Sequence, residues 1–188
     1  DAALAGLAAP DRCPPAARCG LETALLDLIS RQHQLPLYRW LEAKASATVQ
    51  VNANLGNLDS EMNTRLAAST GFSVIKLKVG LLSVSQDIDN LQKLANALPG
   101  GTSLRLDANQ AWNMEQARRF ISGITDLPVE CLEEPLRRPG LEQLEQLQKL
   151  APFTLALDES LTQLCRQDIL SQRPVARLVL KPMLLGGL

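Results

Sequence analysis

Short apolar runs rich in leucine and β-branched residues alternate with longer amphipathic stretches over most of the 188-residue chain. The strand-like runs cover residues 48–55, 74–79, 103–108, 129–134, 154–159 and 177–182. The helix-like stretches cover residues 59–70, 84–98, 113–123, 140–150 and 162–171. Strands that alternate with helices pair in parallel, because a crossover helix returns the chain to the same end of the sheet. The pattern predicts an α/β fold, either a doubly wound sheet or a (β/α) barrel.

Glycine motifs do not favour the doubly wound alternative. No GxGxxG follows the first strand-like run, and the chain contains no P-loop motif. A closed barrel needs eight strands and about 250 residues. We therefore expect a partial TIM-type (β/α) barrel of about six βα units that lacks the last strands. Its domains would be 1–46, an N-terminal segment whose helix (18–31) leads into the barrel, and 47–188, the partial barrel.

Charge and cysteine content exclude several functional classes. The net charge is −1, with 19 basic and 20 acidic residues, so neither nucleic acid nor an anionic membrane is an expected partner. The four cysteines form no CxxC pair and the chain has one histidine, which argues against a zinc site or a disulfide framework. We expect a cytoplasmic protein with reduced thiols. The first residue is not Met and no basic leader precedes an apolar run, so the chain is expected to begin inside a longer protein.

Five successive strand-like runs each end on a charged residue. These residues are Lys78, Asp107, Glu133, Asp158 and Lys181, at intervals of 29, 26, 25 and 23 residues. Each one alone has an ordinary explanation, such as a solvated strand face or a turn. Five in the same register do not share such an explanation. Because the C-terminal strand ends of a barrel line its active-site mouth, we predict that the five side chains line one site.

The residue types in this set indicate a particular chemistry. Three carboxylates supply the hard oxygen ligands that Mg²⁺ prefers, and without a cation they would repel one another. Lys76 shares a strand face with Lys78. Lys76 and the metal would both disfavour a charged ammonium at Lys78, which suits a general base. The set is thus predicted to remove a proton α to a carboxylate, with the metal and a lysine stabilising the resulting negative charge.

The motifs KLK (76–78), DAN (107–109), EEP (133–135), DES (158–160) and KP followed by GG (181–187) resemble those of the enolase superfamily, muconate-lactonizing subgroup. The resemblance covers about residues 18–188. It implies one Mg²⁺ bound by Asp107, Glu133 and Asp158. It also implies Lys78 as the base and Lys181 as the residue that stabilises the enediolate. The same resemblance assigns supporting roles to Lys76 and Asn109 and substrate contacts to Gly186 and Gly187.

Within the subgroup, the stretches IKLKVGL, LRLDANQAW, CLEEP, LALDESL and LVLKPMLLGGL are most similar to the o-succinylbenzoate synthases of menaquinone biosynthesis. That likeness implies a Mg-dependent carbon–oxygen lyase, a dehydratase that eliminates water in the syn sense from a small-molecule carboxylate to give o-succinylbenzoate. The alternatives are a dipeptide epimerase or a muconate cycloisomerase-like enzyme, or an inactive barrel fragment. The resemblance also implies an N-terminal capping domain, which we expect this chain to lack. We therefore expect the segment alone to be poorly stable and nearly inactive.

Overall fold

The computed structural model describes residues 13–58, 66, 69 and 71–188. The helix expected over 59–70 falls almost wholly outside these residues. The chain divides into two compact units. The first contains the described residues up to Gln50 together with Leu180–Leu188, and the second is Val51–Val179.

The second unit is built on a sheet of six parallel strands in the order β1 to β6. These are β1 (Ala53–Asn57), β2 (Val74–Lys78), β3 (Ser103–Asp107), β4 (Val129–Glu133), β5 (Thr154–Leu157) and β6 (Arg177–Leu178). Each strand pairs with the next one in the chain, without the reversal of strand order that defines a doubly wound sheet. The predicted α/β class and partial barrel are therefore confirmed.

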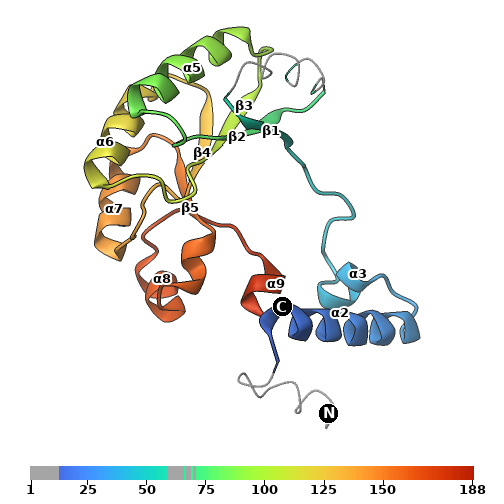
Figure 1. Ribbon diagram of the computed structural model, residues 1–188. Coiled ribbons are helices and arrows are strands. Elements are labelled where there is room, and N and C mark those ends of the chain that lie inside the picture. The colour runs from blue at the N-terminus through green and yellow to red at the C-terminus, as the bar shows by residue number, and fades with distance from the viewer. Residues whose placement is uncertain (1–12, 59–65, 67–68, 70) are drawn as a thin grey trace. The chain divides into compact units, whose positions relative to one another are not determined.

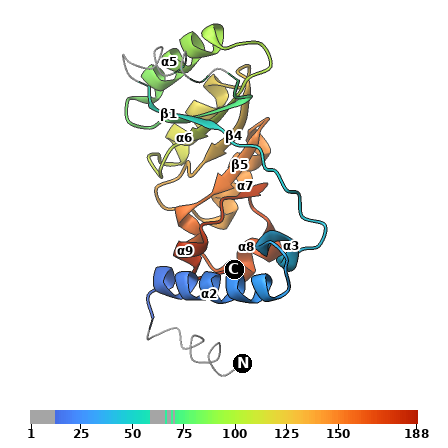
Figure 2. The ribbon, with the colours of Figure 1, turned by 90° about the vertical axis from the view of Figure 1, so that its right-hand side faces the viewer.

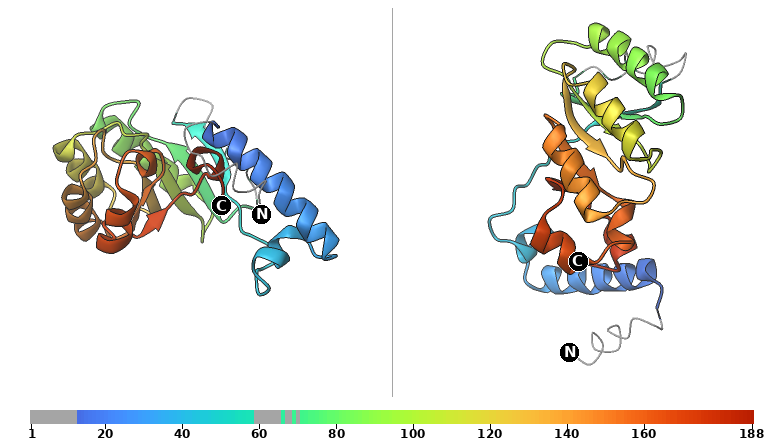
Figure 3. Two further views of the ribbon diagram at one scale, coloured as in Figure 1. Left: turned by 90° about the horizontal axis from the view of Figure 1, so that it is seen from below. Right: turned by 90° about the vertical axis from the view of Figure 1, so that its left-hand side faces the viewer.

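Helices cover one face of this sheet. They are α5 (Val84–Ala97), α6 (Met114–Gly123), α7 (Leu141–Leu150) and the short α8 (Arg166–Gln172). Figure 1 and the right-hand view of Figure 3 show α5, α6 and α7 in succession along the outside of the sheet. Between helices and strands lies a leucine-rich core whose fully buried members include Leu77, Leu106, Phe120, Leu132 and Leu144.

Local sequence signals explain where the helices begin. The Asn113 side chain accepts a hydrogen bond from the backbone N–H of Gln116 at 2.9 Å, and the Gln116 side chain accepts one from the N–H of Asn113 at 3.1 Å. This reciprocal cap, which the sequence predicts for α6, satisfies two donors that a helix start leaves without a helical partner. Ser83 and Gln86 form the same arrangement at the start of α5.

The first and last strands are shorter than the sequence predicts. Pairing with β2 begins at Ala53, and Val49 and Val51 before it are 83% and 66% exposed. Pairing of β6 covers only Arg177 and Leu178. An alternating or apolar pattern is compatible with a strand, but a strand extends only as far as its neighbour offers backbone partners. The expected helix over 162–171 likewise divides into the 3₁₀ turn η1 (Glu159–Thr162) and α8.

The first unit contains three helices within the described residues. They are α2 (Pro15–Gln32), α3 (Leu37–Leu41) and α9 (Pro182–Leu185). Figure 2 shows α9 beside α2. The Arg18 guanidinium donates hydrogen bonds to the carbonyls of Leu185 and Gly186 at the end of α9. The helix predicted over 18–31 is thus confirmed as part of α2. No helix of the described residues has the length and apolar character to cross a membrane.

Candidate active site

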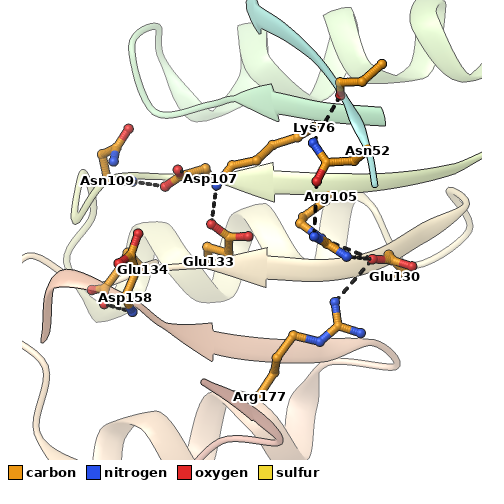
Figure 4. Close-up of polar contacts among 11 residues, drawn as sticks. Asn52, Lys76, Arg105, Asp107, Asn109, Glu130, Glu133, Glu134, Asp158 and Arg177 are labelled. Carbon is orange, nitrogen blue, oxygen red and sulfur yellow. Dashed lines mark hydrogen bonds and ion pairs between the residues drawn. The ribbon is translucent and has the colours of Figure 1, made fainter. Parts of the chain in front are cut away.

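The register of the sheet brings four of the predicted site residues to one edge. Lys78 pairs with Asp107, and Asp107 pairs with Glu133, at the C-terminal ends of β2, β3 and β4. Glu133 pairs with Ala156, and Asp158 follows two residues later, just beyond the end of β5. Residues at corresponding positions of parallel strands point to the same face of a sheet. Figure 4 shows the carboxylates gathered at this edge.

Lys76 lies between two of the carboxylates. Its Nζ is 3.0 Å from Asp107 Oδ2 and also donates to Glu133 Oε2. Asp107 and Glu133 are only 6% and 2% exposed. Burial lowers the pKa of Lys76, but the Glu133 and Asp107 carboxylates outweigh burial and raise that pKa above its ordinary value. Lys76 therefore supports the site by pairing with the Asp107 and Glu133 carboxylates at the ends of β3 and β4.

Asp107 and Glu133 together carry more negative charge than the Lys76 ammonium neutralises. Burial raises the pKa of Glu133 against the opposing effect of Lys76, and the charge of Asp107 adds to the increase. A carboxyl group with a raised pKa is one whose ionised form is poorly compensated. A divalent cation would supply the missing positive charge.

Asp158 is 5% exposed and lies beside Glu134 rather than beside Lys76 (Figure 4). Within the described residues, no three acidic, histidine or cysteine side chains are close enough together to hold a metal ion. The three predicted ligands are thus all carboxylates at the C-terminal ends of neighbouring strands, but their side chains do not converge on one point. The donor set of three buried carboxylates fits Mg²⁺, provided that their side chains rotate toward a common centre.

The loop after β3 holds Asp107 through its backbone. The N–H of Asn109 donates to Asp107 Oδ1 at 3.1 Å. Asn109 and Gln110 have φ values of 43° and 61°, a left-handed conformation that asparagine tolerates better than most residues. The supporting position predicted for Asn109 is therefore one in which the main chain contacts the carboxylate.

The loop after β2 is anchored beside Lys78. The Gly80 N–H donates to the Asp87 carboxylate at 2.7 Å, and Asp87 is 1% exposed. Gly80 has a φ of 84°, and a Cβ there would lie 2.4 Å from the Cβ of Ala111. Both observations fix the chain that leaves the strand end carrying Lys78. The Lys78 side chain itself is exposed.

Three predicted site residues, Lys181, Gly186 and Gly187, belong to the first unit. Lys181 immediately precedes α9, three residues beyond the end of β6. A Cβ at Gly186 would lie 2.1 Å from Arg18 Nη2, and one at Gly187 would lie 2.0 Å from Glu22 Oε2. Gly186 and Gly187 also have φ values of 90° and 130°, which glycine adopts freely. Backbone conformation and packing against α2 therefore explain both glycines, and their contact with substrate stays a prediction.

The sequence did not single out Glu134, the second acid of EEP. It is 1% exposed, has a φ of 47°, and accepts hydrogen bonds from the next strand end. The sequence also did not predict a polar network around Glu130 near the opposite end of β4 (Figure 4). There Glu130 Oε1 accepts from Arg105 at 2.6 Å and from Arg177 at 3.1 Å.

Residues 59–188 match the family model described as enolase C-terminal domain-like. The chain is 28% identical over 175 residues to the L-amino acid-D/L-Glu epimerase of Sulfurimonas denitrificans, covering 91% of this chain and 51% of the relative. It is 29% identical over 177 residues to a chloromuconate cycloisomerase of Cupriavidus pinatubonensis, covering 92% and 48%. The chain thus spans about half the length of these relatives.

Among solved structures, the fold matches a dipeptide epimerase from Enterococcus faecalis with a TM-score of 0.79 and 30% identity. The match covers 94% of this chain and 52% of that chain. The family match includes β2 to β6 and all five charged strand-end positions. The chain belongs to the enolase C-terminal domain-like family.

Proposed function

We propose that this chain forms the catalytic part of a divalent-metal-dependent enzyme that removes the α-proton of a small carboxylate substrate. One observation carries the proposal. Asp107, Glu133 and Asp158 are buried carboxylates at the ends of three adjacent strands, and Lys78 lies at the end of the next strand in register with Asp107. The exposed Lys78 would serve as the base, and the buried carboxylates beside it would form the cation site.

The roles follow from the chemistry of each group. Asp107, Glu133 and Asp158 would hold Mg²⁺, which stabilises negative charge developing on a substrate carboxylate. Lys78 Nζ would take the α-proton as general base. Lys76 holds Asp107 and Glu133 in place through its two ion pairs. We assign to Lys181 either stabilisation of the deprotonated substrate or the delivery of a proton.

Epimerisation of a dipeptide is the reaction that the relatives favour. The similar structure from Enterococcus faecalis is a dipeptide epimerase, and the Sulfurimonas relative is an L-amino acid-D/L-Glu epimerase. An epimerase needs a base on each face of the substrate carbon, and the chain offers Lys78 and Lys181 as candidates. A cycloisomerase reaction of the muconate type is the second candidate, which the Cupriavidus relative supports.

The formation of o-succinylbenzoate has weaker support. It depends on the likeness of the strand-end motifs alone, whereas the relatives described above are epimerases and a cycloisomerase. The synthase reaction needs only one base, because water leaves from the face on which the proton is removed. The two types of reaction are therefore separable by experiment.

The test uses the complete protein that the gene encodes. It is incubated with Mg²⁺ and, separately, with hydrophobic and acidic dipeptides, muconate, and the cyclohexadiene hydroxy-carboxylate that yields o-succinylbenzoate. Chiral chromatography detects epimers, and ultraviolet absorbance follows muconate and the aromatic product. Epimer formation that stops on chelation supports the leading candidate. Absence of turnover with every substrate would support an inactive barrel instead.

A further inference from the structure

We propose that Glu134 is a positioning residue, whose carboxylate fixes the main chain at Asp158 and so holds the third metal ligand at the edge of the sheet. This inference rests on the proposed function. Glu134 contacts neither substrate nor metal in this account. It acts through the segment that carries Asp158.

The Glu134 carboxylate extends the pairing of β4 with β5 beyond the end of the ladder. The N–H of Glu134 donates to the carbonyl of Ala156, which is the last backbone bond from β4 to β5. One step further, the N–H of Asp158 donates to Glu134 Oε1 at 2.5 Å. A side chain thus takes the place of a backbone carbonyl where β5 turns into η1.

Ser160 provides a second anchor on the same carboxylate. Its N–H donates to Glu134 Oε1 at 2.9 Å, and its hydroxyl donates to Oε2 at 2.5 Å. Glu134 and Ser160 are 1% and 0% exposed, so water does not compete for these bonds. With Asp158 N–H, three donors on two residues fix both ends of the turn that contains the Asp158 side chain.

The same cluster reaches the loop after β3. The N–H of Gln110 donates to the carbonyl of Glu134 at 2.7 Å, and the Gln110 side chain donates to the Ser160 hydroxyl at 3.3 Å. The Asn109 N–H in that loop contacts Asp107. Glu134 therefore links the strand ends that carry Asp107, Glu133 and Asp158.

The backbone of Glu134 adopts a conformation that would favour glycine. Its φ of 47° lies in the left-handed region, which side chains with a Cβ rarely adopt and which glycine adopts freely. A glycine would satisfy the turn without strain. A glutamate at this position is explained by its carboxylate, whose two oxygens together accept all three hydrogen bonds. A glutamine would keep one acceptor oxygen but would turn an NH₂ group toward the Ser160 hydroxyl, and it would lose the charge that strengthens the bonds.

The test measures binding of Mn²⁺ alone to the complete protein, by electron paramagnetic resonance and by calorimetry, in Glu134→Gln. We expect its Kd for Mn²⁺ to rise about 10-fold or more, which is typical when a group that orients a metal ligand is lost. The matched control is Glu130→Gln, which removes a hydrogen-bonded acid from the same strand at the opposite end. Its Kd should stay that of the unmodified protein, even if its unfolding midpoint falls.

A double-mutant cycle separates positioning from general destabilisation. If Glu134 acts through Asp158, then Glu134→Gln should weaken binding little further in an Asp158→Asn background. Additive losses, or an unchanged Kd in Glu134→Gln, would overturn the proposal. If Glu134→Gln does not fold, Ser160→Ala removes the hydroxyl bond to Oε2 and should also weaken Mn²⁺ binding. An unchanged Kd in that variant would also count against it.

Failure of the proposed function looks different. In that case the unmodified protein binds no Mn²⁺, or Asp158→Asn binds it as tightly as the unmodified protein does. The positioning role would then fall with the metal site. Tight binding that is lost in Asp158→Asn but retained in Glu134→Gln would remove the positioning role alone.

Discussion

Replacing Lys76 with methionine tests how the acidic edge is held together without a metal. The substitution keeps a long side chain and removes the ammonium that contacts Asp107 and Glu133. Removing one partner of a fully buried ion pair costs about 3–5 kcal/mol. The Lys76 side chain is 21% exposed, so we expect a smaller loss, about 2–3 kcal/mol in the free energy of unfolding.

The assay is urea unfolding of the complete protein, first with chelator and then with saturating Mg²⁺. A ligand at 100 times its Kd stabilises the folded state by about 2.7 kcal/mol. In Lys76→Met the cation replaces the missing ammonium, so the difference in stability from the unmodified protein should shrink when Mg²⁺ is added. The matched control is Lys149→Met. It removes a surface pair with Glu145, whose partners are 72% and 51% exposed, and should cost less than about 0.5 kcal/mol under both conditions.

Two results would refute this reasoning. Equal stability of Lys76→Met and the unmodified protein in chelator would show that the two buried carboxylates do not need the ammonium. A deficit of the same size with and without Mg²⁺ would show that the cation does not bind where Lys76 now compensates the charge.

Three further predictions concern the scaffold. Burial raises the pKa of Glu130, but Arg105 and Arg177 outweigh burial and hold that pKa below its ordinary value of 4.5. The stability that the ionised Glu130 contributes is therefore present above pH 4.5 and is lost as the pH falls through its lowered pKa. Glu130→Gln should therefore be less stable at neutral pH and lose less stability than the unmodified protein when titrated below pH 4.5; parallel titration curves would contradict this. Gly186→Ala should lower the unfolding midpoint, because a side chain is strained at a φ of 90° and the Cβ would displace the Arg18 guanidinium. An unchanged midpoint with impaired turnover would favour a substrate contact instead. Phe120→Ala should cost about 3–5 kcal/mol in chemical denaturation, since Phe120 is fully buried against Trp112, whereas Phe72→Ala, at a residue 39% exposed, should cost far less.

Local periodicity was sufficient to predict the central part of the sheet. The runs that became β2, β3, β4 and β5 each have a paired strand on both sides, so their apolar pattern and their pairing agree. The cap of α6 was equally accessible, because Asn113 and Gln116 are three residues apart. Features that depend on a few adjacent residues are visible in a sequence.

Long-range contacts decided the rest. Lys76 and Glu133 are 57 residues apart, and only the register of three strands shows that their side chains meet. The role proposed for Glu134 depends on a left-handed backbone, which places its carboxylate within hydrogen-bond distance of the Asp158 N–H. Lys181 was expected inside a strand, but strand pairing stops at Leu178 and Lys181 is the N-cap of α9. Pro182 begins that helix, because the first helical position needs no N–H donor.

A metal held at this edge and the base Lys78 are proposed to remove an α-proton together. The most direct measurement follows that proton by ¹H NMR in deuterium oxide, with the complete protein and both epimers of each dipeptide in a panel. We predict loss of the α-proton signal with Mg²⁺ and retention of the signal with chelator. In Lys78→Ala we predict retention of the signal of the epimer whose α-proton Lys78 removes. Exchange that continues in chelator, or that continues for both epimers in Lys78→Ala at the rate of the unmodified protein, would contradict the account.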